Sequence, residues 1–379
     1  MIEIPPRLKE EFPDQGRMVF FDHAAVSPIT KRAKVKVQEF LEKNVDPARI
    51  DCAEFANQVE QARENCGQLI SARPDQVAFI RSTSHGISLI ASGLKWKTGD
   101  NIVTYNQEFP ANIYPWLNLI RKGVEVRMIR DREGRVLVDD LEKLINSRTR
   151  LVAISSVQFT NGYRIDLKAL GQLCRKKGVL LLVDAIQSLG IIPFDLKETP
   201  VDFLAADGHK WLLSLEGLGI LYVNPSVLDQ LEMKVVGWNS VVNAREYLNY
   251  KLELRPDARR FEEGSYNNIS IIGLGASVSL LIETGMDLLF SRALEITQFL
   301  AEELVKKGAK IISPREPEAR SAILSVVPAQ GTLEEIWSKL KERGIICSVR
   351  AGAIRLAPHG YNTIADAEKF LNAWKEIAG

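Results

Sequence analysis

Three apolar segments decide the fold: VLLLVDAIQSLG (179–190), VDFLAADGHKW (201–211) and GLGILYV (217–223). Each contains a run of Val, Leu, Ile or Ala bounded by Gly, Pro or a charge, which is typical of strands buried inside an α/β sheet. The first run ends at Asp184, and Lys210 follows the end of the second run. Because ligands of open α/β sheets gather at the carboxyl ends of the strands, we expect this carboxylate and this amine to meet over one pocket.

An aspartate and a lysine in this arrangement suit pyridoxal phosphate (PLP) chemistry. A lysine amine forms a Schiff base with the aldehyde of PLP, and an acid keeps the pyridine nitrogen protonated so that the ring accepts electrons. We assign these roles to Lys210 and Asp184 as candidate catalytic and cofactor-binding residues. For an isolated Asp and Lys, a helix cap and a surface lysine are the simpler interpretation, so the neighbouring residues decide.

The neighbouring residues form a longer pattern: D-A-x-Q-S at 184–188, D-x-x-x-x-D-G-H-K-W at 202–211 and G-x-G-x-L-Y-V at 217–223. This pattern resembles the class V aminotransferase family of PLP enzymes, which includes cysteine desulfurase and selenocysteine lyase-like members. Lys210 falls on the Schiff-base lysine of that family.

The resemblance implies an α/β protein with the PLP-dependent transferase fold (aspartate aminotransferase-like, fold type I). We expect a large, mostly parallel sheet domain over residues 22–255, which binds PLP. A smaller α/β domain is expected from residues 1–21 together with 256–379.

The composition argues against several other classes of protein. The chain has 379 residues, 46% of them hydrophobic, and a formal net charge of +1, which gives no support for a nucleic-acid or membrane-surface partner. No apolar run approaches the roughly 18 residues of a membrane helix, and the polar N-terminus is not a signal peptide. The 4 scattered cysteines indicate neither a metal site nor a disulfide framework. We therefore expect a cytoplasmic protein without a metal.

The phosphate site is expected where a strand gives way to a helix in VAFIRSTSHGISLIASGL (77–94). Free backbone N–H groups and the helix dipole make such a turn an anion site. Thr83 and Ser84 stand there, and the segment resembles the stretch R-x-T-T-E-G-I-N with which the family binds the PLP phosphate. His85 replaces the Glu of that stretch, and we expect it to be structural.

Two more residues complete the predicted phosphate site. His209 precedes the Schiff-base lysine and is a candidate catalytic residue as well as a cofactor-binding one, and Ser265 lies in RRFEEGSYNN (259–268). That segment resembles the one in which a Gly-Thr pair of the family reaches the phosphate bound by a partner subunit, so the resemblance implies a homodimer. Asp207 takes the place of a phosphate-binding Ser of desulfurases, and its carboxylate would repel the anion.

Other segments resemble the family's contacts with the PLP ring. Ala24 and Ala25 match small residues beside the cofactor, and Phe109 takes the place of an aromatic or His that stacks on the pyridine ring. Phe109 cannot move a proton, so another residue must do so. Phe159 falls where desulfurases have an Asn, which leaves Gln187 as the better donor to the phenolic oxygen. Weaker candidates flank Phe159, namely Gln158 and Asn161.

The substrate carboxylate is assigned to Arg355 in AIRLAPHGYNT (353–363). This segment resembles R-x-S-x-x-x-Y-N-T, whose Arg binds the α-carboxylate of an amino acid. A guanidinium can hold a carboxylate through two parallel hydrogen bonds. Arg350 is a rival for the same role.

The segment just before Arg355 limits the types of reaction that the enzyme can catalyse. Persulfide-forming desulfurases carry a cysteine on a mobile loop shortly before this Arg, and residues 349–354 contain none. Cys347 lies in an apolar β run, where a thiol is usually inert. We therefore predict a PLP enzyme of the aminotransferase or C–S lyase type acting on an α-amino acid. An epimerase or racemase is the alternative, and a desulfurase is disfavoured.

Two other hypotheses are weaker. A dinucleotide-binding protein predicts G-x-G-x-x-G after an early strand, but RSTSHG (81–86) follows VAFI instead. A catalytically idle family member is disfavoured because the key residues are intact, namely Asp184, Gln187, His209, Lys210 and Arg355.

Overall fold

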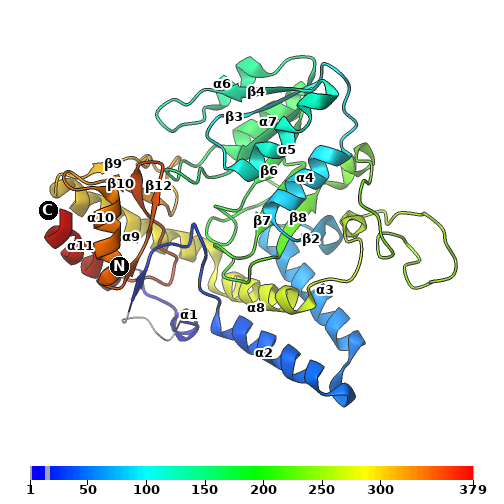
Figure 1. Cartoon of the computed structure of the whole chain (residues 1–379), viewed down its shortest axis with the longest axis horizontal. Coiled ribbons are helices and arrows are strands. Elements are labelled where there is room, and N and C mark those ends of the chain that lie inside the picture. Colours follow the sequence, from blue (N-terminus) through cyan, green and yellow to red (C-terminus); the bar gives the residue numbers. More distant parts are fainter. Residues whose placement is uncertain (1, 13–17, 379) are drawn as a thin grey trace.

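The computed structural model describes residues 2–12 and 18–378 (Figure 1). Its largest element is a 7-stranded sheet with the spatial order β2-β8-β7-β6-β5-β3-β4. Only β8 runs antiparallel to its neighbours, and the other neighbouring pairs are parallel. The strands are β2 (Val77–Ile80), β3 (Asn101–Tyr105), β4 (Glu125–Ile129), β5 (Thr149–Ser155), β6 (Leu180–Asp184), β7 (Phe203–Asp207) and β8 (Gly219–Val223).

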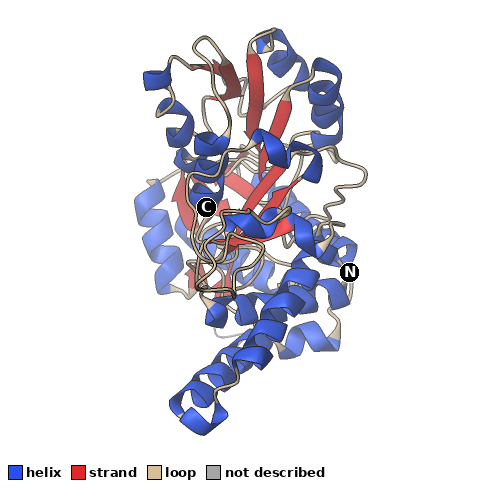
Figure 2. Cartoon of the chain, turned by 90° about the vertical axis from the view of Figure 1, so that its right-hand side faces the viewer, coloured by secondary structure: helices blue, strands red, loops and turns tan. Residues whose placement is uncertain are grey.

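Helices lie on both faces of this sheet (Figure 2), which explains the continuous apolar runs of the sequence. Every residue of β2, β3, β7 and β8 is buried, and the two faces pack into two separate hydrophobic clusters. The helices of this part are α2 (Lys31–Val45), α3 (Cys52–Leu69), α4 (Thr83–Gly93), α5 (Tyr114–Leu117), α6 (Val138–Leu144), α7 (Leu167–Lys177) and α8 (Asn268–Thr284).

A smaller lobe lies at the left of Figure 1 and contains both ends of the described chain. Its antiparallel sheet has the order β12-β13-β10-β9, and β1 pairs with β11 beside it in parallel. Its elements are β1 (Val19–Phe20), α9 (Met286–Lys306), β9 (Lys310–Ile311), β10 (Leu324–Val327), α10 (Leu333–Glu342), β11 (Ile345–Ile346), β12 (Ser348–Arg350), β13 (Ala353–Leu356) and α11 (Ile364–Ala378). Helix α1 (Pro6–Glu10) precedes them, but its Leu8 belongs to the large hydrophobic cluster. The predicted architecture of a large, mostly parallel sheet plus a smaller α/β part is confirmed.

The predicted domain boundary at residue 255 stays a prediction, and residues 1, 13–17 and 379 of the predicted small domain lie outside the described residues. The packing favours a later boundary. Helix α8 packs against α2 and α3, and its Ile271 and Leu274 belong to the large hydrophobic cluster. Helix α9 contributes Ile296 and Leu300 to the separate cluster of the small lobe. We propose that the boundary falls near Gly285, between these two helices.

Among the described residues, no single helix is both long and apolar enough to cross a membrane. Helices α8 and α9 meet that test only as a pair, which is bent by 81°.

Candidate active site

One cavity of about 350 Å³ lies at the carboxyl ends of β6 and β7. Strands β12 and β13 of the small lobe close its other side through Arg350 and Arg355. Most of the predicted site residues line this cavity, namely Ala24, Ala25, Thr83, Ser84, Phe109, Asp184, Gln187, His209, Lys210 and Arg355.

Lys210 and Asp184 lie in this cavity as buried groups of opposite charge. Asp184 is the last residue of β6, and its Oδ1 accepts a hydrogen bond of 3.0 Å from the Ile186 N–H. Burial raises the pKa of Asp184 to about 7. Burial also lowers the pKa of Lys210 to about 8, although the charge of Asp184 opposes this shift. A Lys with a pKa of about 8 has an appreciable neutral fraction near neutral pH, as a nucleophilic amine requires.

Thr83 and Ser84 open helix α4 directly after β2, as the sequence predicts. Ser82 caps the helix by accepting a 3.1 Å hydrogen bond from the His85 N–H. Thr83 Oγ1 is buried and has no hydrogen-bond partner among the described residues. A buried hydroxyl without a partner at a helix N-terminus fits an anionic ligand that is bound there.

His209 lies next to the same end of the cavity. Its Nδ1 is 3.3 Å from Asp207 Oδ1, but the geometry forms no hydrogen bond, and this nitrogen is unpartnered among the described atoms. The carbonyl of His209 accepts a 2.8 Å hydrogen bond from the Ser27 N–H, which ties the Lys210 loop to the N-terminal segment.

Gln187 is fixed at both ends of its amide. Its Nε2 donates to the Ala24 carbonyl at 3.0 Å, and its Oε1 accepts from Trp211 Nε1 at 3.0 Å. One N–H of the side chain is therefore left for a ligand, consistent with the predicted donor role.

Phe109 lies over the lysine. Lys210 Nζ is 5.6 Å from the centroid of the Phe109 ring, and Phe159 packs edge-on against Phe109 with centroids 5.3 Å apart. Phe109 is 43% exposed, so one face of its ring is free to stack on a flat ligand.

Arg355 is buried on β13 with only 1% of its surface exposed. Its Nη1 donates to the Phe159 carbonyl at 2.9 Å, and its Nη2 lies 3.5 Å from Asp22 Oδ1. Its Nε has no partner among the described atoms. Burial lowers the pKa of Arg355 to about 10, so the guanidinium stays charged at neutral pH and can bind an anion.

Strands β12 and β13 are joined by a turn of two residues, Ala351 and Gly352, with Arg350 paired to Ala353. Both turn residues have positive φ, 47° and 77°, as the tightest hairpins require. Cys347, just before β12, is 4% exposed, and burial raises its pKa to about 12. The turn therefore contains no cysteine, and the nearest thiol in the sequence is buried and protonated at neutral pH.

The sequence interpretation missed Glu108, which is buried and directly precedes Phe109 in the chain. Ser155 donates to it through both its N–H and its hydroxyl, Gln158 Nε2 donates at 2.9 Å, and Asn112 Nδ2 donates at 3.2 Å. These donors stabilise an ionised carboxylate, although burial raises the pKa of Glu108. Its charge is one of the causes that raise the pKa of Asp184, after burial. The sequence did not reveal Glu108, because the Ser, Gln and Asn residues that donate hydrogen bonds to it form no recognisable motif.

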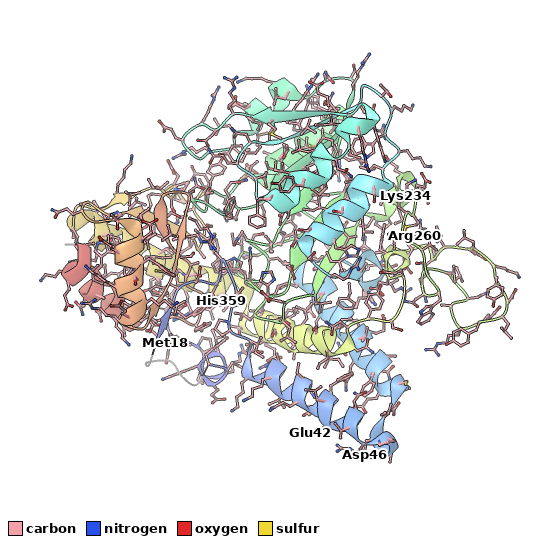
Figure 3. The ribbon with its side chains drawn as sticks, in the orientation of Figure 1. Met18, Glu42, Asp46, Lys234, Arg260 and His359 are labelled. Carbon is pink, nitrogen blue, oxygen red and sulfur yellow. The ribbon has the colours of Figure 1, made fainter. Side chains whose placement is uncertain are left out.

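The interpretation also missed a buried aromatic cluster below Lys210. His23 bonds the Ala357 carbonyl at 2.7 Å and the Tyr361 hydroxyl at 2.8 Å, and His359 stacks on Trp211 with centroids 6.0 Å apart. Figure 3 shows His359 at the junction of the two lobes. Burial lowers the pKa of His359 to about 4, so this cluster is uncharged and acts as packing.

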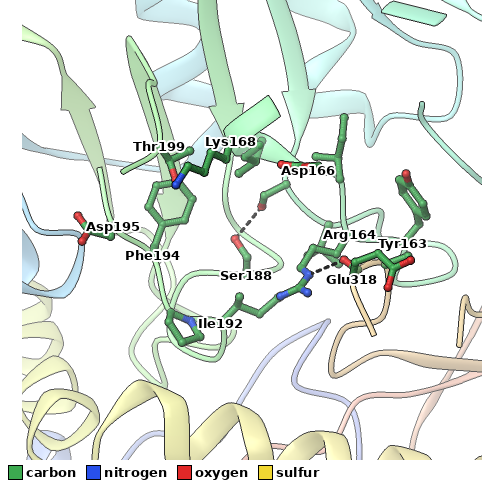
Figure 4. Close-up of a pocket in the computed structure, with 16 residues that line it drawn as sticks. Tyr163, Arg164, Asp166, Lys168, Ser188, Ile192, Phe194, Asp195, Thr199 and Glu318 are labelled. Atoms are coloured by element: carbon green, nitrogen blue, oxygen red, sulfur yellow. Dashed lines mark hydrogen bonds between the residues drawn. The ribbon is translucent and has the colours of Figure 1, made fainter. Parts of the chain in front are cut away.

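A second cavity of about 360 Å³ is lined by residues of both lobes (Figure 4). Several of its polar groups are paired: the Ser156 and Ser188 hydroxyls are 2.6 Å apart, and Arg164 donates to the Glu318 carbonyl at 3.1 Å. Its lining also includes Lys168 and Asp166, but Lys168 pairs with Glu198 at 3.0 Å and Asp166 accepts from the Ala169 N–H at 2.9 Å. The first cavity brings Lys210 and Asp184 together with Thr83 Oγ1 and Arg355 Nε, which are unpartnered among the described atoms, so we place the active site there.

Several weaker predictions fall outside the active-site cavity. Gln158 donates to Glu108, and Asn161 Nδ2 donates to the Gly134 carbonyl at 2.8 Å. Neither lines the cavity, so Gln187 is left as the amide donor. His85 contacts Arg81 at 3.1 Å, as expected of a structural residue. Ser265 is exposed and lies outside the cavity of its own chain.

The comparisons with known proteins agree with this geometry. The family model of class V aminotransferases matches residues 19–362. A probable cysteine desulfurase of Methanothermobacter thermautotrophicus is 31% identical, over 85% of this chain and 84% of its own. The uncharacterized aminotransferase YcbU of Bacillus subtilis is 28% identical, over 100% and 98%.

Solved structures show the same fold. The apo cysteine desulfurase of Thermococcus onnurineus superimposes with a TM-score of 0.91 at 23% identity, covering 100% of this chain and 99% of its own. A variant of C-DES with glycine linked covalently to its PLP cofactor gives a TM-score of 0.90 at 20% identity, covering 97% and 99%.

The fold and the cavity thus define a PLP-dependent enzyme of fold type I. The chain belongs to the class V aminotransferase family, and PLP is its cofactor. The residues present fit that group: unpartnered Thr83 Oγ1 suits its phosphate, the unpartnered Oδ2 of Asp184 suits its protonated ring nitrogen, and Lys210 suits its aldehyde.

Proposed function

We propose that this enzyme acts on an α-amino acid by transamination or by β-elimination of the C–S lyase type. The observation that supports this most is the convergence of Lys210, Asp184 and Arg355 on one cavity. Bound PLP supplies an electron sink for a bond broken at the α-carbon.

Each residue has a proposed task. Lys210 binds the aldehyde of PLP through its amine and afterwards takes or gives a proton at the α-carbon. Asp184 holds the proton of the pyridine nitrogen, because an ionised carboxylate beside a buried cation is the stable pairing. Arg355 binds the α-carboxylate, and Phe109 covers the ring without taking part in proton transfer.

Thr83, Ser84, His209 and a partner's Ser265 are proposed to hold the phosphate. The exposure of Ser265 and its place outside its own cavity support a role in a second copy of the chain. We therefore propose that the enzyme is a homodimer, and we keep the separate expectation that it is cytoplasmic. Sedimentation of the purified enzyme tests the dimer, and Ser265→Ala should weaken PLP retention if the contact crosses between subunits.

We further propose that no protein thiol takes part, although relatives are named cysteine desulfurases. The two-residue turn Ala351-Gly352 offers no cysteine, and Cys347 is buried. A persulfide-forming desulfurase needs an accessible thiolate beside the substrate sulfur, which a buried thiol with a pKa of about 12 does not supply. Epimerisation stays the alternative reaction, because it also needs only Lys210 and a cofactor.

Two experiments test the proposal. Borohydride reduction of the holoenzyme followed by peptide mapping should place the PLP label on Lys210, and Lys210→Ala should lose it. A label on another lysine, or a colourless protein that ignores added PLP, contradicts the proposal. A panel of L-amino acids, scored separately for pyruvate, for sulfide and for amine transfer to a keto acid, separates elimination from transamination, and chiral analysis detects epimerisation.

A further inference from the structure

Two arginines share one face of the small-lobe sheet at the active-site cavity. In the register of β12 and β13, Ser348 is opposite Arg355, and Arg350 is opposite Ala353. Side chains on a strand alternate between faces, so Arg350 and Arg355 project on the same side and are diagonal neighbours. Both line the cavity. Like charges placed this way repel each other unless an anion lies between or beside them.

The two arginines differ in how they are held. Arg355 is buried and has Asp22 Oδ1 and the Phe159 carbonyl as partners. Arg350 is exposed, and its Nη1 donates only to the carbonyl of its own neighbour Val349, at 2.8 Å. No carboxylate of the described residues forms an ion pair with Arg350.

Both arginines act on the lysine. Burial is the main cause of the lowered pKa of Lys210, and the charges of Arg355 and, more weakly, Arg350 add to it. Since both line the cavity but Arg355 is buried and Arg350 is exposed, Arg350 lies nearer the cavity mouth. An α-carboxylate close to Lys210 is therefore matched by Arg355. The charge of Arg350 acts on Asp22 from a distance, but among the described residues no carboxylate forms a hydrogen bond or an ion pair with it.

We infer that Arg350 is a second anion subsite, and that the substrate is an α-amino acid whose side chain carries a carboxylate or a similar anion. The inference rests on the proposed function and deepens it by naming the substrate class. The α-carboxylate binds Arg355, and the side-chain anion binds Arg350 at the mouth, with the reacting α-carbon left near Lys210.

The test compares two unreactive probes, glutarate with two carboxylates and butyrate with one, by titrating the holoenzyme and following its visible absorbance. In Arg350→Gln the dissociation constant of glutarate should rise about tenfold or more, since charged hydrogen bonds are lost. The constant for butyrate should change by less than about threefold, as expected when its only carboxylate lies elsewhere. Arg121→Gln, a change at an exposed arginine outside the cavity, is the control and should alter neither constant.

Two results would overturn the inference. An equal loss for both probes would assign Arg350 to the α-carboxylate, and no loss for either would leave Arg350 as a solvated surface charge. Arg350→Lys keeps the charge and should restore most of the preference for glutarate, which separates a binding role from damage to the hairpin. The probes do not react, so the binding test gives a result whether or not the enzyme turns over an amino acid. If no amino acid is turned over, the proposed function is contradicted, but the measured affinities for glutarate and butyrate still test the role of Arg350.

Discussion

Asp22 and Arg355 come from opposite ends of the chain, yet Asp22 Oδ1 lies 3.5 Å from Arg355 Nη2. The same oxygen accepts a 2.8 Å hydrogen bond from Ser348 Oγ. Burial raises the pKa of Asp22, and the charge of Arg355 opposes this. Asp22 therefore anchors one end of the guanidinium, while Phe159 anchors another nitrogen, and the Nε of Arg355 is left unpartnered beside the cavity.

Replacing this guanidinium tests the binding of the substrate carboxylate. Arg355→Ala should raise the KM for the amino acid by roughly one to two orders of magnitude, because two hydrogen bonds to a charged group are lost. Steady-state kinetics at saturating PLP measures the effect. Arg121→Ala is the matched control. An unaltered KM would move the role to Arg350 or remove it.

The unpartnered hydroxyl of Thr83 predicts a change in cofactor retention. Thr83→Val should raise the dissociation constant of PLP by about fivefold or more, since one hydrogen bond to a phosphate is lost, and should affect turnover at saturating PLP less. Equilibrium dialysis measures the dissociation constant of PLP. Thr104→Val is the control, because Thr104 Oγ1 is also buried and unpartnered but does not line the cavity. Equal PLP affinity in both variants would show that the phosphate site is misassigned.

Glu108 predicts an effect on the neighbouring Asp184. In Glu108→Gln, the amide NH₂ would face the hydrogen-bond donors that now surround the carboxylate. One buried donor would lose its acceptor, which should lower the free energy of unfolding by about 1–3 kcal/mol. Loss of the negative charge should also lower the pKa of Asp184, so the pH profile of the visible absorbance should shift to lower pH. Glu142→Gln, on the surface beside Lys177, is the control and should change the free energy of unfolding much less, because a solvated ion pair contributes little. A destabilised variant with an unmoved pH profile would limit Glu108 to a structural role.

The free energy of unfolding of the apoprotein should depend on pH through the protonation of Asp184. The pKa of Asp184 rises from 3.8 to about 7 in the fold, so in that window the folded state keeps a proton that the unfolded chain releases. The free energy of unfolding should therefore fall as the pH rises from about 4 to about 7. Urea unfolding of Asp184→Asn should show a weaker slope, whereas Asp139→Asn, at an exposed position, should follow the parent. Parallel curves for Asp184→Asn and the parent would refute the assignment.

Cys347 is predicted to be dispensable for turnover. Cys347→Ser should keep kcat/KM within about threefold of the parent, because a buried thiol that contacts no substrate contributes only packing. Mass spectrometry of the parent during turnover should find no persulfide on this residue. A persulfide trapped on Cys347, together with loss of turnover in a folded variant that retains PLP, would restore the desulfurase assignment.

Most of the fold could be predicted because its strands are buried on both faces. Continuous apolar runs such as those at β6 and β7 have no solvent side, so the sequence pattern and the structure coincide there. The positions of Lys210 and Asp184 followed, because the carboxyl ends of parallel strands meet at one edge. Arg355 could be placed only through the family motif, since an arginine on a short strand has no local signature.

What the sequence could not predict depends on contacts between distant segments. Glu108 looks like any loop glutamate until Ser155 and Gln158, from another strand and loop, donate to it. His23 is likewise ordinary in sequence, and its bonds to Ala357 and Tyr361 arise only when the two ends of the chain meet. The packing of α8 on α2 and α3 is a third example, because an apolar helix does not reveal which lobe it covers.

The turn between Arg350 and Ala353 has a consequence for protein engineering. Ala351 and Gly352 are exposed, and a Cβ built on Gly352 meets no atom within 4 Å. Insertions are tolerated best at such exposed tips. A longer segment bearing a cysteine could be grafted there without disturbing the sheet, and the hairpin would then present a thiol to the cavity that the natural chain lacks. Within one scaffold, the length of a single turn would then decide whether a protein thiol can take part in the reaction.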